Sequence, residues 1–308
     1  MQYTNGWLAF ELGVLRRLKF ESIALPFTGE PEIAIHLKRW KIRVAANDPM
    51  LWSYIKATAL IENHTDQLEE DDLETLLDDA YVPRDKLDNP AMLKWFNETD
   101  AWWFDNVRFN AERLEPFKQA LALTVGMMVG DYVLSFSEQT RALREPFSLS
   151  KVFRLMLNCL PSVFDNTLQN KSSNQDVGIF VAERHHTDLL FLRLPTPVTQ
   201  SSTSRDPLVS WREEWVRGGD NFWLDLERER ARLGSRVQSK QQYLGFVEDL
   251  LRTASHIPAW AIAHTENGFI SNDELVEKVS RVRKVESIYS KDFSDLLGVR
   301  ASVIVSTS

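Results

Sequence analysis

Short apolar runs alternate with amphipathic stretches in the first sixty residues, and this alternation limits the folds open to the chain. The apolar run F-E-S-I-A-L-P-F (20–27) leads into the turn T-G-E-P (28–31), and an amphipathic stretch follows. A second run, I-R-V-A-A-N-D-P (42–49), precedes the helically periodic segment 52–61. Strand–helix–strand successions of this kind build parallel sheets covered by helices. The pattern therefore predicts an α/β protein with a Rossmann-like, mostly parallel sheet.

The connections between these runs predict where a ligand site would lie. Right-handed crossovers would place the turn at 28–31 and Asp48 at the same edge of the sheet, its carboxyl edge. Open α/β sheets bind their ligands outside this edge. We therefore expect the turn and Asp48 to contribute to one site.

Residues 65–176 differ from their flanking segments, because apolar residues recur there at helical spacing without a convincing strand. The region begins with an acidic run, which has twelve acidic and three basic side chains at 65–100. It ends with the polar loop N-K-S-S-N-Q-D at 170–176. We interpret 65–176 as a helical insertion and a candidate target-recognition or partner-binding subdomain. The α/β core would then consist of 1–64 and 177–308.

The sheet is expected to resume after this insertion. The apolar runs V-G-I-F-V-A (177–182) and T-D-L-L-F-L-R-L (187–194) predict two strands, and A-W-A-I-A-H-T (259–265) predicts a third. The sequence S-N-D-E at 271–274 has the capping-box pattern that opens a helix. The run V-E-S-I-Y-S (285–290) predicts a last strand.

The charge distribution bears on nucleic-acid binding. A net charge of −8 argues against indiscriminate binding of nucleic acid through bulk attraction. One segment reverses this balance and sets five basic side chains against Glu229 alone. These candidate contacts for double-stranded DNA are Arg228, Arg230, Arg232, Arg236 and Lys240. The alternative interpretation of the segment is a solvated helix surface.

Composition also limits the chemistry and the compartment. The single cysteine, Cys159, excludes an internal disulfide and a cysteine-rich metal site, and it indicates a reducing compartment. His185 and His186 are adjacent and would face opposite sides of a strand, so we predict no metal site. Neither a signal-peptide pattern nor an apolar run of the roughly 18 residues needed to span a bilayer is visible. We expect a cytoplasmic protein without a membrane partner.

An ordered set of segments that covers most of the chain (a cofactor loop, a helical insertion, a catalytic strand and a tail) resembles one protein family. The segment from L-P-F-T-G-E-P to N-D-P (25–49) is similar to the cofactor half of the D12-class, Dam-like DNA N6-adenine methyltransferases. In that family an acidic-Pro-Phe-x-Gly-x-Gly loop precedes a helix and a strand ending in Asn-Asp. The tail at 260–290 is similar to the family's ending of strand, turn, capped helix and edge strand. The resemblance implies a methyltransferase sheet with an antiparallel edge strand and S-adenosylmethionine as the cofactor.

The resemblance assigns Phe27, Gly29 and Asp48 to a vestigial cofactor site. The glycine would let the backbone approach the cofactor closely, and Asp48 would accept hydrogen bonds from the ribose hydroxyls. The match is incomplete, because Pro31 stands where the family has a second glycine. Trp7 likewise stands where the family has a lysine near the cofactor.

The family's catalytic tetrapeptide Asp-Pro-Pro-Tyr is replaced by Arg193, Leu194, Pro195 and Thr196. In the family, the acid and a proline carbonyl accept hydrogen bonds from the adenine amine, and the aromatic ring stacks on the flipped base. Arg193 cannot accept a hydrogen bond, and Thr196 has no stacking face. We therefore predict that no catalytic residue remains.

These departures favour a catalytically inactive homologue that acts as a DNA-binding or scaffolding subunit of a DNA modification, restriction or defence complex. Its expected protein partner is an active methyltransferase or a nuclease subunit, and it would need no cofactor. One alternative is an active, divergent DNA N6-adenine methyltransferase that still binds S-adenosylmethionine. Another is a repurposed pocket in a structural component.

Overall fold

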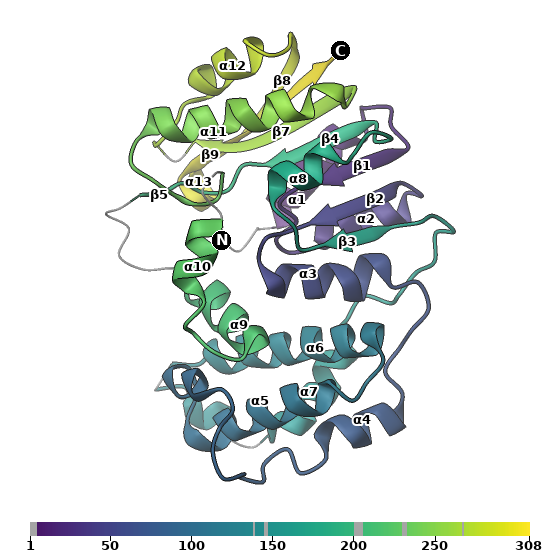
Figure 1. Cartoon of the computed structure of the whole chain (residues 1–308), viewed down its shortest axis with the longest axis vertical. Helices are drawn as coiled ribbons and strands as arrows, with labels where there is room; N and C mark the ends of the chain where they lie inside the picture. Colours follow the sequence, from purple (N-terminus) through teal and green to yellow (C-terminus); the bar gives the residue numbers. More distant parts are fainter. Residues whose placement is uncertain (1–4, 138, 145–146, 200–205, 230–232, 267) are drawn as a thin grey trace. The chain divides into compact units, whose positions relative to one another are not determined.

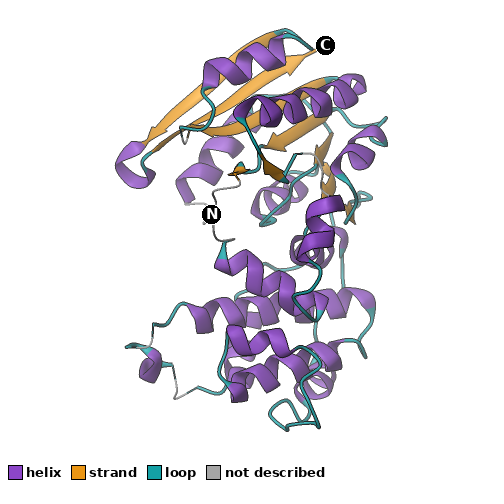
Figure 2. Cartoon of the chain, turned by 60° about the vertical axis from the view of Figure 1, so that its left-hand side comes forward, coloured by secondary structure: helices purple, strands orange, loops and turns teal. Residues whose placement is uncertain are grey.

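The computed structural model divides the chain into two compact units (Figure 1). It describes residues 5–137, 139–144, 147–199, 206–229, 233–266 and 268–308. The first, the sheet unit, contains Met1–Pro49, Asn166–Thr203 and Leu224–Ser308. The second, the helical unit, contains Met50–Asp165 and Ser204–Trp223. Where strands are described they belong to the sheet unit, whereas the described part of the helical unit consists of helices and loops (Figure 2).

A seven-stranded sheet with the order β3-β2-β1-β4-β7-β9-β8 forms the sheet unit. Its strands are β1 (Ser22–Leu25), β2 (Arg43–Asn47), β3 (Lys171–Ser173), β4 (Leu189–Arg193), β7 (Ala259–Glu266), β8 (Val285–Phe293) and β9 (Val299–Thr307). The first five strands of this order are mutually parallel, and β9 pairs antiparallel with both β7 and the edge strand β8. The predicted Rossmann-like α/β class is confirmed.

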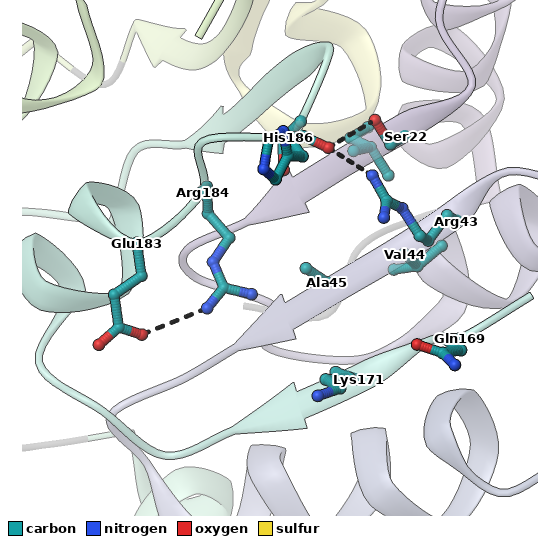
Figure 3. Close-up of a pocket in the computed structure, with 11 residues that line it drawn as sticks. Ser22, Arg43, Val44, Ala45, Gln169, Lys171, Glu183, Arg184 and His186 are labelled. Carbon is teal, nitrogen blue, oxygen red and sulfur yellow. Dashed lines mark hydrogen bonds and ion pairs between the residues drawn. The ribbon is translucent and has the colours of Figure 1, made fainter. Parts of the chain in front are cut away.

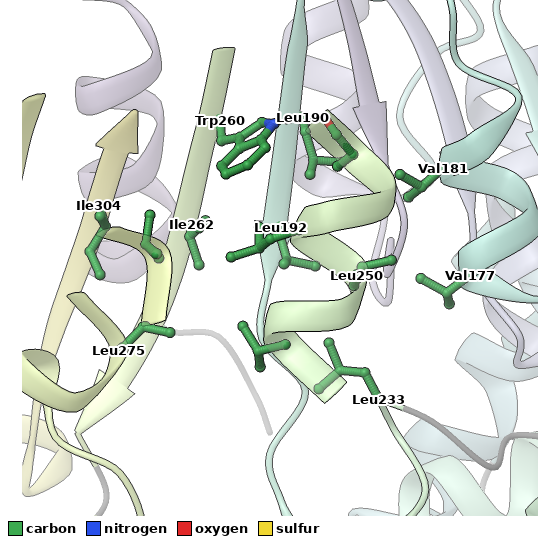
Figure 4. Close-up of a cluster of buried hydrophobic side chains, with 14 of the residues drawn as sticks. Val177, Val181, Leu190, Leu192, Leu233, Leu250, Trp260, Ile262, Leu275 and Ile304 are labelled. Carbon is green, nitrogen blue, oxygen red and sulfur yellow. Dashed lines mark hydrogen bonds between the residues drawn. The ribbon is translucent and has the colours of Figure 1, made fainter. Parts of the chain in front are cut away.

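Helices cover both faces of this sheet (Figure 1). The helices of the sheet unit are α1 (Asn5–Leu15), α2 (Glu32–Arg39), α8 (Val177–Ala182), α10 (Trp223–Glu229, beginning at the unit boundary), α11 (Lys240–Thr253), η4 (Ala254–His256), α12 (Asn272–Ser280) and α13 (Ser294–Leu297). Helices α8, α11 and α12 share one apolar cluster with the sheet (Figure 4). In β4, Leu190 and Leu192 point into this cluster, so Phe191 and Arg193 point to the opposite face.

Three local predictions need correction. The run 177–182 is the helix α8 rather than a strand, because the Asp176 side chain caps it by accepting the Ile179 N–H at 3.0 Å. A six-residue apolar run cannot distinguish a buried helix from a buried strand by periodicity. The polar loop at 170–176 contains β3, and β8 is followed by a further strand, β9. The capping box that opens α12 at Ser271 is confirmed.

The helical unit is organised around α6 (Pro116–Leu134). Its other elements are α3 (Leu51–Ala57), the π-helical turn η1 (Thr58–Glu62), α4 (Glu70–Leu77), η2 (Pro90–Lys94), α5 (Glu98–Ala111), η3 (Arg141–Leu143), α7 (Leu149–Leu157) and α9 (Pro207–Arg217). Two tryptophans of α9 pack onto two glycines of α6. A Cβ added at Gly126 would lie 2.2 Å from the Trp215 ring, and one at Gly130 would lie 2.2 Å from the Trp211 ring.

The polar residues of α9 are also part of this packing. The two carboxylate oxygens of Glu213 accept hydrogen bonds from the backbone N–H groups of Leu51 and Trp52, in the first turn of α3. Both distances are 3.0 Å. The unit therefore incorporates 204–223, although the predicted helical insertion was the single segment 65–176. It also begins at Met50, so α3 belongs to it rather than to the sheet unit.

A small two-stranded sheet completes the sheet unit. Strand β5 (Val198–Thr199) pairs in parallel with β6 (Arg236–Val237). Among the residues that the structure describes, no helix combines the length and the hydrophobicity that crossing a bilayer requires.

Candidate ligand site at the carboxyl edge of the sheet

The strand order places a topological switch point at β1. From β1 the chain moves outward to β2 and β3, and it then returns past β1 to β4 on the other side, so the direction of strand addition reverses at β1. Ligands of open α/β sheets bind outside the carboxyl ends of the strands at such a point. The loop after Leu25 and the end of β4 at Arg193 are therefore the part of the edge where a ligand would be expected.

Gly29 and Asp48 are brought together at this edge. The Gly29 N–H donates to one carboxylate oxygen of Asp48 at 2.8 Å, and Asp48 is buried. Gly29 has φ of +57°, a left-handed conformation that strains any residue with a Cβ. Nothing lies within 4 Å of where its Cβ would be, so the backbone angle, not close packing within the chain, requires the glycine.

Asn47 links the ends of three strands, and the sequence did not indicate this role. Its side-chain amide donates to the carbonyls of Pro26 and Gln175, both at 3.2 Å. Its side-chain oxygen accepts the Ser173 hydroxyl at 2.9 Å and the Gln175 N–H at 3.0 Å. Each hydrogen-bonding group of this buried amide is satisfied, which fixes the loops after β1, β2 and β3 relative to one another.

Arg193 forms a buried ion pair with Glu11 of α1. The guanidinium Nε lies 3.0 Å and 3.2 Å from the two carboxylate oxygens, and Nη2 lies 2.5 Å from one of them. Arg193 is 7% exposed and Glu11 is 1% exposed. Arg193 stands at the position of the family's catalytic acid, but the alternation of β4 turns its guanidinium toward α1.

The three residues after Arg193 extend the strand and then leave the sheet. The Leu194 N–H donates to the Ala263 carbonyl at 3.0 Å, and its side chain packs on the apolar cluster. The Pro195 carbonyl accepts the Tyr243 hydroxyl at 2.8 Å. Burial raises the pKa of Tyr243 well above its usual value, so the hydroxyl stays protonated and donates. Thr196 is exposed.

Phe27 contacts a segment that the sequence had not connected with it. Its ring comes within 3.4 Å of the position that a Cβ on Gly234 would occupy, and Gly234 has φ of +98°. The neighbouring Leu233 and Val237 are buried in the same apolar cluster that Phe27 packs against. The segment 233–237 thus lies beside the loop that follows β1.

The predicted basic segment is only partly described. Arg230 and Arg232 lie outside the described residues, and the Arg228 side chain is likewise not described. Arg236 pairs with Glu227 at 3.4 Å, and Lys240 pairs with Glu274 at 2.9 Å. All four partners of these two pairs are substantially exposed, so the pairs are weak and leave the charges accessible to solvent.

The edge therefore combines a buried carboxylate, a left-handed glycine and a satisfied amide. Within the described residues, no group of three or more potential metal ligands is found. No protein-family model matches the chain, and no curated protein matches it either.

Proposed function

We propose that this chain is a methyltransferase-shaped protein that does not transfer methyl groups and instead serves as a DNA-binding or scaffolding subunit of a modification, restriction or defence complex. The observation that carries the proposal is the ion pair between Arg193 and Glu11. Amine methylation of adenine needs a hydrogen-bond acceptor at the end of the catalytic strand, so that the nitrogen lone pair faces the methyl donor. A guanidinium has no acceptor atom.

The surrounding residues do not replace the missing acceptor. Both carboxylate oxygens of Glu11 already accept hydrogen bonds from Arg193. The Pro195 carbonyl accepts the Tyr243 hydroxyl, and the exposed Thr196 offers no ring to stack on a base. This occupied arrangement favours a protein that keeps the sheet and has no use for S-adenosylmethionine chemistry.

The second candidate, an active divergent DNA N6-adenine methyltransferase, draws support from the bond between Gly29 and Asp48. That bond holds the loop after β1 in a defined shape at the edge where a cofactor would bind. The divergent enzyme would bind S-adenosylmethionine through Phe27, Gly29 and Asp48. A hydrogen-bond acceptor for the adenine amine would have to come from outside 193–196.

A methyl-transfer assay with calorimetry separates the two candidates. The full chain is incubated with radiolabelled S-adenosylmethionine and unmethylated duplex DNA, and the cofactor is titrated separately up to about 1 mM. We expect neither label in the DNA nor heat of binding. Label in adenine that is lost in Asp48→Ala would overturn the proposal, and it would establish the divergent enzyme.

The DNA-binding part is tested by a mobility shift at several salt concentrations. We expect the affinity for duplex DNA to fall steeply with salt, because phosphate contacts release counterions. Replacing Arg228, Arg230, Arg232, Arg236 and Lys240 by glutamine should weaken binding and reduce the salt dependence. A control, Lys86→Gln with Lys151→Gln, removes two exposed charges from the helical unit and should have little effect. Its comparison with the variant that carries Arg236→Gln and Lys240→Gln alone gives the contribution per charge. Equal binding by all of these proteins would exclude the basic segment as the DNA contact, and no binding by the unsubstituted protein would favour the scaffolding role.

A further inference from the structure

A hollow lies in the sheet unit at the amino edge of the sheet, opposite the carboxyl edge described above (Figure 3). Strands β1 and β2 begin opposite each other at Ser22 and Arg43, and β3 begins two residues farther along the strand direction, with Lys171 opposite Ala45. The hollow has a volume of about 230 Å³, and Ser22, Arg43, Ala45, Lys171, Arg184 and His186 are among its lining residues.

The small side chains beneath the hollow and the connections between the strands explain why this space is not filled. Ser22 and Ala45 are small side chains, and Ala45 packs against the same apolar cluster as α8, which places it on that face of the sheet. The connection from β2 to β3 contains residues 50–165 of the helical unit. In the described part of the sheet unit, the connection from β3 to β4 adds the six-residue helix α8 on this face.

Positive charge is concentrated around this space. Arg43, Lys171 and Arg184 line it, and Glu183 is the only carboxylate among its described lining residues. Even when Glu183 is counted, the lining carries two net positive charges in a chain whose net charge is −8. Asp188, which lies close by, is already held by the Ser22 hydroxyl at 2.8 Å.

The three cations are held in different ways, and each keeps donors for a ligand. Arg43 donates through Nη2 to the His186 carbonyl, which orients its guanidinium along the rim (Figure 3). Arg184 lies 4.7 Å from the centre of the Phe180 ring and 3.3 Å from Glu183 through Nη2. Its Nε is buried without a hydrogen-bond partner among the described residues. Lys171 is exposed and forms no ion pair among them.

We propose that this hollow binds a small phosphate-bearing anion, either inorganic phosphate or a phosphate monoester. Guanidinium groups match the geometry of phosphate oxygens, and lysine adds a mobile positive charge. The terminal nitrogens of Arg43 and Arg184 and the Lys171 ammonium would each donate a charge-assisted hydrogen bond to such an oxyanion. The volume is below the roughly 300 Å³ at which pockets for larger ligands begin, so the ligand is small.

This proposal is independent of the proposed function, because its residues lie at the other end of the strands. Calorimetric titration of the full chain with inorganic phosphate and with glycerol 3-phosphate, at low ionic strength, tests it. We expect saturable binding of at least one of them. Lys171→Gln and Arg184→Gln should each weaken binding by about tenfold, since each removes charge-assisted hydrogen bonds.

Two further variants separate a built site from bulk attraction. Lys284→Gln removes the same charge from an exposed position in the same unit and should leave affinity unchanged. Ala45→Val fills the floor without changing charge, and it should weaken binding by a similar factor. Melting temperatures establish that each variant is folded. If Arg184→Gln unfolds, Lys171→Gln and Ala45→Val still decide the question.

Three outcomes would overturn the proposal. The first is the absence of heat at about 10 mM of either anion. The second is equal weakening by Lys284→Gln and Lys171→Gln, which would indicate unspecific attraction. The third is a short DNA duplex that competes with phosphate more strongly than the monoester does, which would assign these cations to a nucleic-acid surface instead.

Discussion

The glycines inside helix α6 of the helical unit and the glycine inside helix α11 of the sheet unit have opposite surroundings. In α6 of the helical unit, a Cβ at Gly126 or Gly130 would lie 2.2 Å from a tryptophan ring of α9. In the sheet unit, Gly13 of α1 and Gly245 of α11 have nothing within 4 Å of that position. Close contact between these glycines and tryptophans therefore fixes the position of α9 on α6 within the helical unit. Helix α11 instead packs on the sheet through broad apolar contact.

The sheet unit places its specific contacts at the ends of its strands. At one end of β4, Arg193 is buried against Glu11, and at the other end Asp188 accepts three hydrogen bonds from Glu21 and Ser22. Packing of the apolar cluster tolerates small changes of shape, whereas a buried charge tolerates no loss of its partner. Substitutions at these two kinds of contact, the glycine–tryptophan fit of α6 and the ion pair of β4, should therefore have different effects on stability.

The largest effect is expected for Arg193→Leu. This change leaves Glu11 buried without its partner, and it should lower the free energy of unfolding by about 3–5 kcal/mol. The double variant Glu11→Leu with Arg193→Leu removes both charges and should recover most of that loss. Urea denaturation followed by circular dichroism measures both. A loss below about 1 kcal/mol for the single variant would mean that Arg193 is not held as described.

Gly130→Ala should cost somewhat less. The new methyl group collides with the Trp211 ring, and overpacking of this kind lowers the free energy of unfolding by about 1–3 kcal/mol. Gly245→Ala is the matched control, because it gains the same helical propensity without a collision. It should stabilise the protein by about 0.5–1 kcal/mol. Thermal unfolding of the two variants, measured side by side, isolates the packing contribution. Similar melting temperatures would refute the contrast between the units.

For Asp188→Asn, at the amino end of β4, we expect an effect on the free energy of unfolding that depends on pH. Burial alone would raise the pKa of Asp188, but hydrogen bonds from Ser22 and Glu21, together with the Arg43 charge, lower it overall. A lowered folded-state pKa means that the stabilisation is present above the unfolded pKa of about 3.9, and that it is lost as the pH falls through the folded value. At pH 7 the free energy of unfolding of the wild type should be about 1 kcal/mol higher than that of the variant. The two values should become equal in acid. A difference that persists below both pKa values would point to packing instead.

The sequence predicted the class of fold because strands and helices alternate at both ends of the chain. It also placed Gly29 and Asp48 at one edge, since crossover handedness leaves little choice. It could not predict the partner of Arg193, because Glu11 lies 182 positions away along the chain. Successive side chains of a strand face opposite sides, so Leu192 and Arg193 diverge, but this rule does not say which helix covers each side. The docking of 204–223 depends on the fit of tryptophan against glycine, which spacing alone does not reveal.

The smallest effect is expected at the exposed ion pairs of the basic segment. Arg236→Gln with Lys240→Gln breaks the pairs with Glu227 and Glu274, yet the free energy of unfolding should change by no more than about 0.5 kcal/mol per pair. Solvent screens these charges, unlike the pair of Arg193 with Glu11. Urea denaturation of this variant beside Arg193→Leu measures the contrast. A loss of unfolding free energy close to that of Arg193→Leu would show that the basic segment stabilises the fold. Any loss of DNA binding in its variants would then reflect unfolding rather than missing phosphate contacts.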